Sequence, residues 1–430
     1  VSGSDIYKNE NVIRLKNLGI KIKIGHDPQN ISNTDLLVYS SAIPLENPEI
    51  MMARQKKIPV IRRAEMLGEL ISFKETSIAI GGTHGKTTTS SIIGTLLGYA
   101  KKDPTLIIGG LVQNINSNSK MGSGKVIVVE ADEYDKSFLA LKPTLAIITN
   151  IELEHTDCYK NLNELKKAFI QFAKAVPFYG EIIVCIDSPP VKEIINQIER
   201  PIITYGLTDE ALYQAKNLKY KEHKSSYDIF FDGKKLGNIN LNVPGEHNIL
   251  NSLAAVSLCI EMGISFRIIK NSLLKYKGVR RRFDIKGTYN NIMIVDDYAH
   301  HPTEIATTLN AAKKGWEKRI VAVFQPHLFS RTLKFYKEFS LALEIADIII
   351  ITEIYPAREK PIPGVSSKLI YSELVKIKKN NCFLIPDLND LQKNLNKLLK
   401  PNDLLITLGA GTIWRYNISY TNYLKKISKK

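Results

Sequence analysis

Ile78-Ala79-Ile80-Gly81-Gly82-Thr83-His84-Gly85-Lys86-Thr87-Thr88-Thr89 is the stretch that decides the fold of this chain. An apolar strand is predicted over 77–80, and a helix is predicted from Lys86 because apolar residues between 92 and 100 recur on one face. The backbone amides of a glycine-rich turn between strand and helix can wrap a phosphate, and the helix start adds its dipole. The pattern predicts a nucleotide-binding loop, with an ordinary glycine-rich turn as the alternative.

The residue types within this turn predict how a nucleotide would be held. Lys86 would reach the β- and γ-phosphates, and the hydroxyl of Thr87 would bind Mg²⁺. The strict phosphate-loop pattern requires glycine where Ile80 stands, so the match is the shorter Gly82-x-x-Gly85-Lys86-Thr87. The predicted nucleotide-binding residues of the loop are Gly82, Thr83, His84, Gly85, Lys86, Thr87 and Thr88.

Short apolar segments alternate with amphipathic segments along almost the whole chain, which is typical of α/β domains with parallel sheets. The spacing predicts three such domains in series, over residues 1–76, 77–283 and 284–430. Within the second domain, the segment 202–243 reads as shorter, turn-rich strands. At ~100–200 residues per domain, a chain of 430 residues has room for three.

The composition is that of a soluble globular protein, with 44% hydrophobic and 24% charged residues. No run approaches the ~18 consecutive apolar residues of a membrane helix, so we expect no membrane partner. The four cysteines lie far apart, which argues against a zinc ribbon or disulfide scaffold and suits the cytoplasm. The net charge of +16 fits a polyanionic partner or a solvated surface; because the lysines are dispersed, we favour the surface and expect no nucleic acid.

Polar residues follow two strands of the second domain, where the ligands of parallel sheets collect. Glu130 ends the predicted strand 126–129, and His155 lies shortly after the predicted strand 145–149. A carboxylate is a natural Mg²⁺ ligand, so Glu130 is the first candidate. Histidine is unusual on Mg²⁺, and by itself His155 reads more readily as a surface or capping residue.

Further polar or basic segments are candidates for binding a ligand. Asn248 opens a predicted helix, where its amide could bond an adenine edge or merely cap the helix. The basic cluster 278–283 could be a nucleic-acid patch, a domain hinge or a set of phosphate clamps. The segments 296–304 and 324–331 each follow a predicted strand of the third domain, so together they predict a pocket for a polar, anionic small molecule.

These motifs occur in one order along the chain. They are Gly82–Thr88, Glu130-Ala131-Asp132-Glu133, Asn150-Ile151-Glu152 with His155, Gly245 with His247-Asn248, Arg281-Arg282-Phe283, Asp296–Glu304, and Gln325-Pro326-His327 with Ser330-Arg331. Taken together the chain resembles the Mur ligases over essentially its whole length, and within them the branch that joins L-alanine to UDP-N-acetylmuramate. The resemblance implies a Rossmann-like N-terminal domain, a central P-loop ATPase domain with a parallel sheet and a small β region, and a Rossmann-like C-terminal domain.

The resemblance also implies an ATP-dependent ligase of peptidoglycan precursor synthesis that uses Mg²⁺. ATP would phosphorylate the muramic acid carboxylate, and the amine of L-alanine would attack the acyl phosphate. Lys86 would lie on the transferring phosphoryl group, with Thr87 and Glu130 on one Mg²⁺ and His155 on a second. The implied catalytic residues are Lys86, His155, His300 and Arg331. The residues implied to hold the adenosine are Asn248, Arg282 and Asp297. The residues implied to face the substrate carboxylates are His300, His327 and Arg331.

One part of the family pattern is expected to be missing. The resemblance implies that the chain begins at the second strand of the N-terminal domain, without the first strand and the glycine-rich loop that hold the UDP group. We therefore expect an incomplete first domain that binds UDP-N-acetylmuramate weakly, in a monomer or weak homodimer. The remaining candidates for UDP contacts are Ser2, Ser4, Asp5, Ser40, Ser41 and Asn47.

Two other functions compete with this interpretation. The nearer is the recycling ligase that attaches a whole tripeptide to UDP-N-acetylmuramate and shares the nucleotide and metal residues. The segments Ile61–Met66 and Pro177–Gly180 favour the alanine-adding branch. The more distant alternative is a non-enzymatic nucleotide switch or a nucleic-acid-binding ATPase, which the net charge and Arg280–Arg282 suggest. That alternative leaves the polar segments 296–304 and 325–331 unexplained.

Overall fold

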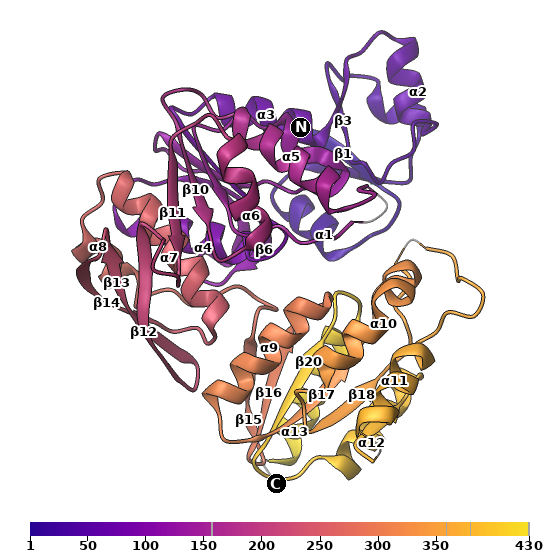
Figure 1. Cartoon of the computed structure of the whole chain (residues 1–430). Helices are drawn as coiled ribbons and strands as arrows, with labels where there is room; N and C mark the ends of the chain where they lie inside the picture. Colours follow the sequence, from indigo (N-terminus) through magenta and orange to yellow (C-terminus); the bar gives the residue numbers. More distant parts are fainter. Residues whose placement is uncertain (156–157, 358, 379, 429–430) are drawn as a thin grey trace.

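The computed structural model describes residues 1–155, 158–357, 359–378 and 380–428. The chain folds into three α/β domains in series, which confirms the predicted fold class (Figure 1). The middle domain, drawn from purple to pink, connects the indigo N-terminal part to the orange and yellow C-terminal part. Within the described ranges, no helix combines the length and the apolar character needed to cross a bilayer.

The N-terminal part contains two small parallel sheets. β1 (Ser2–Asp5) pairs with β2 (Lys21–Ile24), and β3 (Leu37–Tyr39) pairs with β4 (Val60–Arg62). The intervening helices are α1 (Glu10–Asn17), the 3-10 helix η1 (Pro28–Ile31), α2 (Pro48–Gln55) and α3 (Arg63–Ser72). The parallel pairing agrees with the prediction, whereas the four strands do not join into the single sheet that the strand–helix alternation predicts.

The middle domain is built on a ten-stranded sheet with the order β14-β13-β12-β11-β10-β9-β5-β8-β6-β7. Its parallel strands are β5 (Thr76–Gly81), β6 (Thr105–Val112), β8 (Val126–Glu130), β9 (Leu145–Ile148), β10 (Glu181–Cys185) and β11 (Ile202–Gly206). The carboxyl ends of β5, β8 and β9 therefore open on one edge of the sheet, where polar residues of three segments can meet.

Three further strands extend this sheet at one side, namely β12 (Tyr213–Lys221), β13 (Lys224–Phe231) and β14 (Lys234–Leu241). β12 runs parallel to β11, and the pairs β12–β13 and β13–β14 are antiparallel. The prediction of shorter strands over 202–243 agrees with β11, which has five residues, but it is wrong for these three strands, which have eight or nine residues each. In β13 the alternating buried residues are Ser225, Tyr227 and Ile229, and the serine among them weakens the apolar alternation that indicates a strand. The sequence also gave no indication of β6 and of β7 (Ser117–Lys120), because Gly109-Gly110 inside β6 reads as a turn.

Helices cover both faces of the middle sheet. α4 (Lys86–Tyr99) is almost entirely buried and packs against α7 (Glu246–Glu261) and α8 (Phe266–Leu273) on one face. α5 (Leu162–Lys174) covers the other face with Phe169 and Phe172. The shorter helices of this domain are η2 (Tyr134–Ala140), α6 (Pro189–Ile194) and η3 (Ile195–Gln197). The helix that begins at Lys86 is thus enclosed between the sheet on one side and α7 and α8 on the other.

The C-terminal domain has a six-stranded sheet with the order β15-β16-β20-β17-β18-β19. Its strands are β15 (Asp284–Tyr289), β16 (Ile292–Asp297), β17 (Arg319–Phe324), β18 (Ile348–Ile351), β19 (Cys382–Leu384) and β20 (Asp403–Leu408), of which β15 alone among them pairs antiparallel. Its helices are α9 (Pro302–Gly315), α10 (Phe329–Leu343), α11 (Lys368–Lys378), η4 (Leu388–Asp390), α12 (Leu391–Leu398) and α13 (Ile413–Ile427). The loops after β16 and β17 face the middle domain, because Thr303 and Arg331 contact acids that follow β9.

We predict that Phe172→Ala lowers the local unfolding free energy of the middle domain by about 3–5 kcal/mol, because it leaves a cavity in a fully buried aromatic cluster. Hydrogen exchange of the β5 and β9 amides under native conditions measures this change. Phe178→Ala is the matched control, since the Phe178 side chain is exposed, and it should change the value by less than about 0.5 kcal/mol. Equal effects of the two substitutions would contradict the assignment of this core.

Candidate active site

The turn between β5 and α4 requires glycine at two positions. Gly82 has φ +134° and Gly85 has φ +85°, both in the region that disfavours other residues. A Cβ on Gly82 would overlap Thr149 Oγ1, and a Cβ on Gly85 would overlap Asn251 Oδ1. The loop is therefore fixed between the end of β9 and the helix α7, and its backbone path depends on both glycines.

The backbone amides of this turn fall into two groups. The amides of Thr83 and His84 donate to Asn150, to its carbonyl oxygen at 3.0 Å and to its Oδ1 at 2.8 Å. The first amides of α4 have no acceptor within the helix, as at every helix start. Of the seven predicted loop residues, those at the start of α4 thus offer amides and dipole to a phosphate, while Thr83 and His84 hold the loop in shape.

Lys86 lies against a buried carboxylate that the sequence did not single out. Its Nζ is 2.6 Å from Glu133 Oε2 and also donates to the carbonyls of Gly82, at 2.7 Å, and Thr83, at 3.2 Å. Burial lowers the pKa of Lys86, but the charge of Glu133 outweighs burial and raises it, so the ammonium stays charged. Burial raises the pKa of Glu133 to about 7 against the charge of Lys86.

The predicted metal residues surround the same lysine. Glu130 lies beside the Thr87 hydroxyl and accepts the Gly109 amide at 2.8 Å, and burial raises its pKa. His155 Nε2 lies 3.7 Å from Glu133 Oε1, a buried oxygen that accepts no hydrogen bond from the residues that the structure describes. Burial lowers the pKa of His155, which favours the neutral ring that can bind a metal.

These side chains fit a divalent cation. Asp132, Glu133 and His155 place one ligand atom each within 4.8 Å of one another, and oxygen ligands suit Mg²⁺. Asp132 and Glu133 are therefore candidates that the sequence analysis missed. They lie in the predicted motif at 130–133, but nothing in the sequence shows that the chain turns back there and points Glu133 at Lys86.

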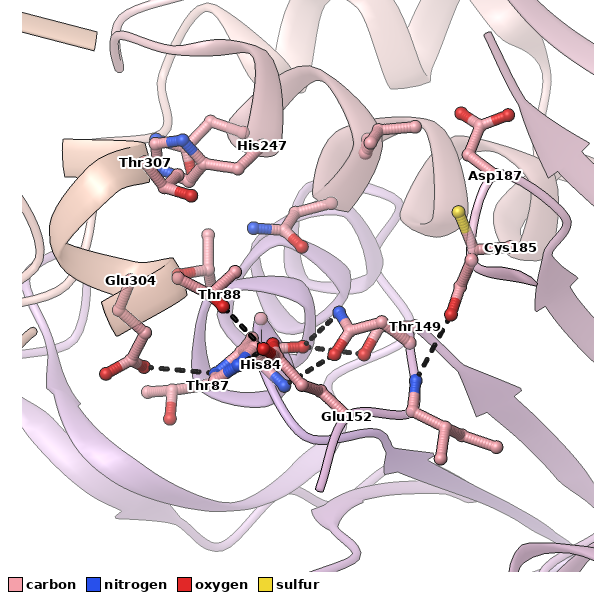
Figure 2. A pocket seen from close by; sticks show the side chains of 18 of the residues that line it. His84, Thr87, Thr88, Thr149, Glu152, Cys185, Asp187, His247, Glu304 and Thr307 are labelled. Atoms are coloured by element: carbon pink, nitrogen blue, oxygen red, sulfur yellow. Dashed lines mark hydrogen bonds and ion pairs between the residues drawn. The ribbon is translucent and has the colours of Figure 1, made fainter. Parts of the chain in front are cut away.

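A cavity of about 480 Å³ opens beside the start of α4, between the middle and C-terminal domains (Figure 2). Its size is that of a small-molecule site. The predicted residues that line it are His84, Gly85, Thr87, Thr88, Asn248, Arg282 and Asp297. The sequence analysis missed its less polar wall, which is made by Cys185, Pro189, Pro190, Tyr205 and Leu250. Cys185 and Tyr205 lie near the ends of β10 and β11, the two prolines begin α6, and Leu250 lies on α7. Apolar residues at such positions read only as core.

The three predicted adenosine residues are each held in place. Asn248 donates to the Pro244 carbonyl at 2.7 Å. Arg282 Nη1 lies 3.2 Å from Glu304 Oε1, and its guanidinium lies over the ring of Tyr298. Asp297 accepts the amides of Phe283 and Ala299, both at 2.8 Å, and burial raises its pKa to about 6. The side of the cavity that belongs to the domain junction is thus preorganised.

The three residues predicted for substrate carboxylates lie together around another acid. Arg331 Nη2 is 3.0 Å from Glu154 Oε1, and Arg331 Nη1 is 3.2 Å from His327 Nδ1. His300 Nε2 is 3.6 Å from the same Glu154 oxygen. Burial would raise the pKa of Glu154, but His300 and Arg331 outweigh burial and hold it well below its ordinary value. A buried carboxylate of the middle domain therefore pairs with side chains of the C-terminal domain that were predicted to bind substrate carboxylates.

The residues predicted for UDP contacts lie in the first domain and stabilise local turns. The Ser4 hydroxyl donates to Glu49 at 2.7 Å, and Asn47 Oδ1 accepts the Glu49 amide as the cap of α2. Asp5 accepts the Tyr7 amide at 3.0 Å, and Ser40 Oγ accepts that of Ala42. Ser2 and Ser41 are exposed. Ser4 and Asn47 are thus brought to one acid, and their role toward a ligand stays a prediction.

A group of His84, Glu152, His301 and Glu304 joins the phosphate loop to α9. His84 Nε2 lies 2.9 Å from Glu152 Oε2, and His84 Nδ1 lies 3.5 Å from Glu304 Oε1, as the labelled side chains of Figure 2 show. Its members occur in three separate sequence motifs, but their contacts could not be predicted because the partners come from distant segments.

The geometry defines a cavity that two α/β domains share beside a glycine-rich turn, and comparison with known proteins shows the class of the protein. The chain belongs to the Mur ligase family. Residues 1–75 match the model of the Mur ligase family catalytic domain, residues 80–259 the Mur ligase middle domain, and residues 281–411 the Mur ligase glutamate ligase domain. The family resemblance predicted from the sequence is thereby confirmed.

Individual relatives show which members of the family this chain is similar to. The chain is 44% identical over 425 residues to the UDP-N-acetylmuramate–L-alanine ligase of Geotalea uraniireducens, covering 99% of this chain and 93% of the relative. It is 46% identical to that of Persephonella marina, covering 99% and 92%. The solved UDP-N-acetylmuramate–alanine ligase MurC of Thermotoga maritima matches with a TM-score of 0.84 at 28% identity, covering 99% and 93%. The murein peptide ligase of Psychrobacter arcticus, at 23% identity and a TM-score of 0.69, shows the same fold.

We predict that Gly82→Ala weakens ATP binding at least about tenfold, because the added Cβ collides with Thr149 and the backbone must leave its positive φ. Calorimetric titration with MgATP measures the effect. Gly98→Ala is the matched control, because a Cβ at Gly98, near the other end of α4, meets no atom within 4 Å. Unchanged affinity in Gly82→Ala would show that the loop path does not matter for the nucleotide.

Proposed function

We propose that this chain is an ATP-dependent ligase that joins L-alanine to the carboxylate of UDP-N-acetylmuramate through an acyl phosphate, in peptidoglycan precursor synthesis. One observation carries the proposal. The phosphate loop of the middle domain and the Arg331 cluster of the C-terminal domain contact the same short segment, Glu152–Glu154. A ligase of this kind must hold a phosphoryl donor and a carboxylate close together, and a segment that touches both halves provides that proximity.

The side chains of this site can be given roles in the reaction. Lys86 would move from Glu133 to the transferring phosphoryl group and stabilise its charge. Arg331 and His300 would bind the carboxylate of a substrate in place of Glu154. Asn248, Arg282 and Asp297 would hold the adenosine. Both substrates would thus bind by replacing carboxylates that the protein itself supplies.

The metal ligands that we propose are Thr87 and Glu130 for one Mg²⁺, and His155 with Asp132 or Glu133 for a second. A bound Mg²⁺ supplies positive charge to phosphoryl oxygens, which is the chemistry that phosphoryl transfer needs. We further propose that the protein acts in the cytoplasm as a monomer or weak homodimer.

The alternatives are less well supported. For the tripeptide-recycling ligase, two solved relatives are 23% and 24% identical to this chain, and they match the fold alone. A nucleic-acid-binding ATPase would need a free basic face. Instead, Arg281 Nη2 donates to the Gly409 carbonyl at 2.6 Å and Arg282 pairs with Glu304, so these arginines bind protein groups at the domain junction.

We predict that Lys86→Ala reduces ATP-dependent turnover at least about 100-fold, because it removes a cation from the transition state. Phosphate release with saturating substrates measures turnover, and far-UV circular dichroism checks that the fold survives. Lys167→Ala is the control, since Lys167 is exposed on α5, away from the site. An unchanged turnover rate in Lys86→Ala would contradict the assignment of the phosphoryl-transfer site.

We predict that the enzyme forms the L-alanine adduct when L-alanine and the tripeptide L-alanyl-γ-D-glutamyl-meso-diaminopimelate compete at equal concentration with UDP-N-acetylmuramate and ATP. Mass spectrometry of the products separates the two adducts by their mass. A reaction without ATP gives the background. A tripeptide adduct as the main product would move the protein to the recycling ligases.

A further inference from the structure

The backbone of His84 is fixed by the middle domain. Its amide donates to Asn150 Oδ1 at 2.8 Å, and its carbonyl accepts the Thr149 hydroxyl at 2.6 Å and Asn150 Nδ2 at 3.0 Å. These three bonds hold the phosphate loop on the end of β9 without help from the imidazole. The side chain of His84 is therefore available for a separate task.

The imidazole of His84 lies between acids of two domains. Nε2 contacts Glu152 of the middle domain at 2.9 Å, and Nδ1 contacts Glu304 of the C-terminal domain at 3.5 Å. Burial would lower the pKa of His84, but Glu152 and Glu304 outweigh burial and raise it to about 10. A positively charged ring between two carboxylates attracts both, so it draws the two domains together across the cavity.

Glu304 contacts nitrogen atoms from three segments. Its Oε1 lies 3.2 Å from Arg282 Nη1 as well as 3.5 Å from His84 Nδ1, and its Oε2 accepts the His300 amide at 3.1 Å. His300 Nδ1 lies 3.3 Å from the same Oε2. One buried carboxylate thus joins the phosphate loop, the domain junction and a residue expected at the substrate carboxylate. Removing its charge would loosen all three at once.

A bound metal is the competing explanation for part of this group, because His84, Glu152 and His301 place ligand atoms within 4.8 Å of one another. The contacts argue against it. Glu152 already accepts from His84 and from the Thr303 hydroxyl, at 2.6 Å, so both of its oxygens are engaged. A metal would also have to displace the proton of His84, which two acids stabilise. We therefore interpret the group as a contact between domains.

We propose that His84 and Glu304 are positioning residues that hold the C-terminal domain closed over the phosphate loop, so that the two substrates meet only when the loop is correctly formed. The inference deepens the proposed ligase function and rests on it for its kinetic consequences. The contact itself does not depend on which acid and amine are joined. A failure of the ligase assignment would therefore leave the structural part of the proposal open to its own test.

Three variants test the proposal: His84→Gln, Glu304→Gln and the double variant. Each keeps the approximate shape of the side chain and removes its charge. Glu246→Gln is the matched control, because Glu246 forms an ion pair with Lys314 across the same two domains but at an exposed position, at 3.2 Å. Exposed pairs contribute little, so this variant should behave as the unmodified protein does.

The first measurement is small-angle X-ray scattering of each variant with Mg²⁺ and a non-hydrolysable ATP analogue. We expect a larger radius of gyration for His84→Gln and Glu304→Gln than for the unmodified chain and Glu246→Gln, because the domains separate. This measurement needs no turnover, so it remains decisive even if the chain does not form the L-alanine adduct. Equal radii in all variants would overturn the proposal.

The second measurement is a double-variant cycle on kcat and on the dissociation constant of ATP. We expect kcat to fall about tenfold in His84→Gln, while its ATP affinity changes less than about threefold because the loop backbone is held by Thr149 and Asn150. If the two residues act together, Glu304→Gln should lower kcat by a smaller factor in the His84→Gln background than it does in the unmodified chain. Multiplicative losses, or a loss confined to ATP affinity, would show that the two residues act separately.

Discussion

The rest of the site depends on the attachment of the phosphate loop to the end of β9. Asn150 accepts the amides of Thr83 and His84 and donates to the His84 carbonyl, so one residue fixes three bonds of the turn. Because β9 and β5 are neighbours in a buried parallel sheet, the loop inherits the rigidity of the core. The amides at the start of α4 then point in one direction, which is the condition for binding a phosphate without reorganisation.

The same strand end also determines where the second half of the site must lie. Two acids follow Asn150 in this segment. Glu152 contacts His84 of the phosphate loop and Thr303 of the C-terminal domain. Glu154 contacts Arg331 and His300 of the C-terminal domain. A loop of only a few residues thus contacts both the side of the site that we propose for the nucleotide and the side that we propose for the carboxylate. Its length limits how far apart the two substrates can be held, which is a geometric reason for placing the reaction at this junction.

The fold class and the family could be predicted from the sequence, because both rest on local patterns. The strand, the glycines and the helix from Lys86 occur within twelve residues, and each is visible without knowledge of the rest of the chain. The pairing of Lys86 with Glu133 and of His84 with Glu304 could not be predicted, because it depends on how separate segments turn in space. The less polar wall of the cavity, which includes Tyr205, could not be predicted for another reason. An apolar residue that lines a cavity has the same local sequence pattern as one in the core.

The four cations described around the site each have a carboxylate of the protein as partner: Lys86 with Glu133, His84 with Glu152, Arg282 with Glu304, and Arg331 with Glu154. Binding of an anionic substrate is then an exchange of partners, in which one carboxylate gives up a cation to another anion. Such an exchange releases few counterions from solution, so the affinity for anionic substrates should depend only weakly on ionic strength. The displaced carboxylates also stay close by, ready to reclaim their cations, and this competition favours the departure of ADP and phosphate after each turnover.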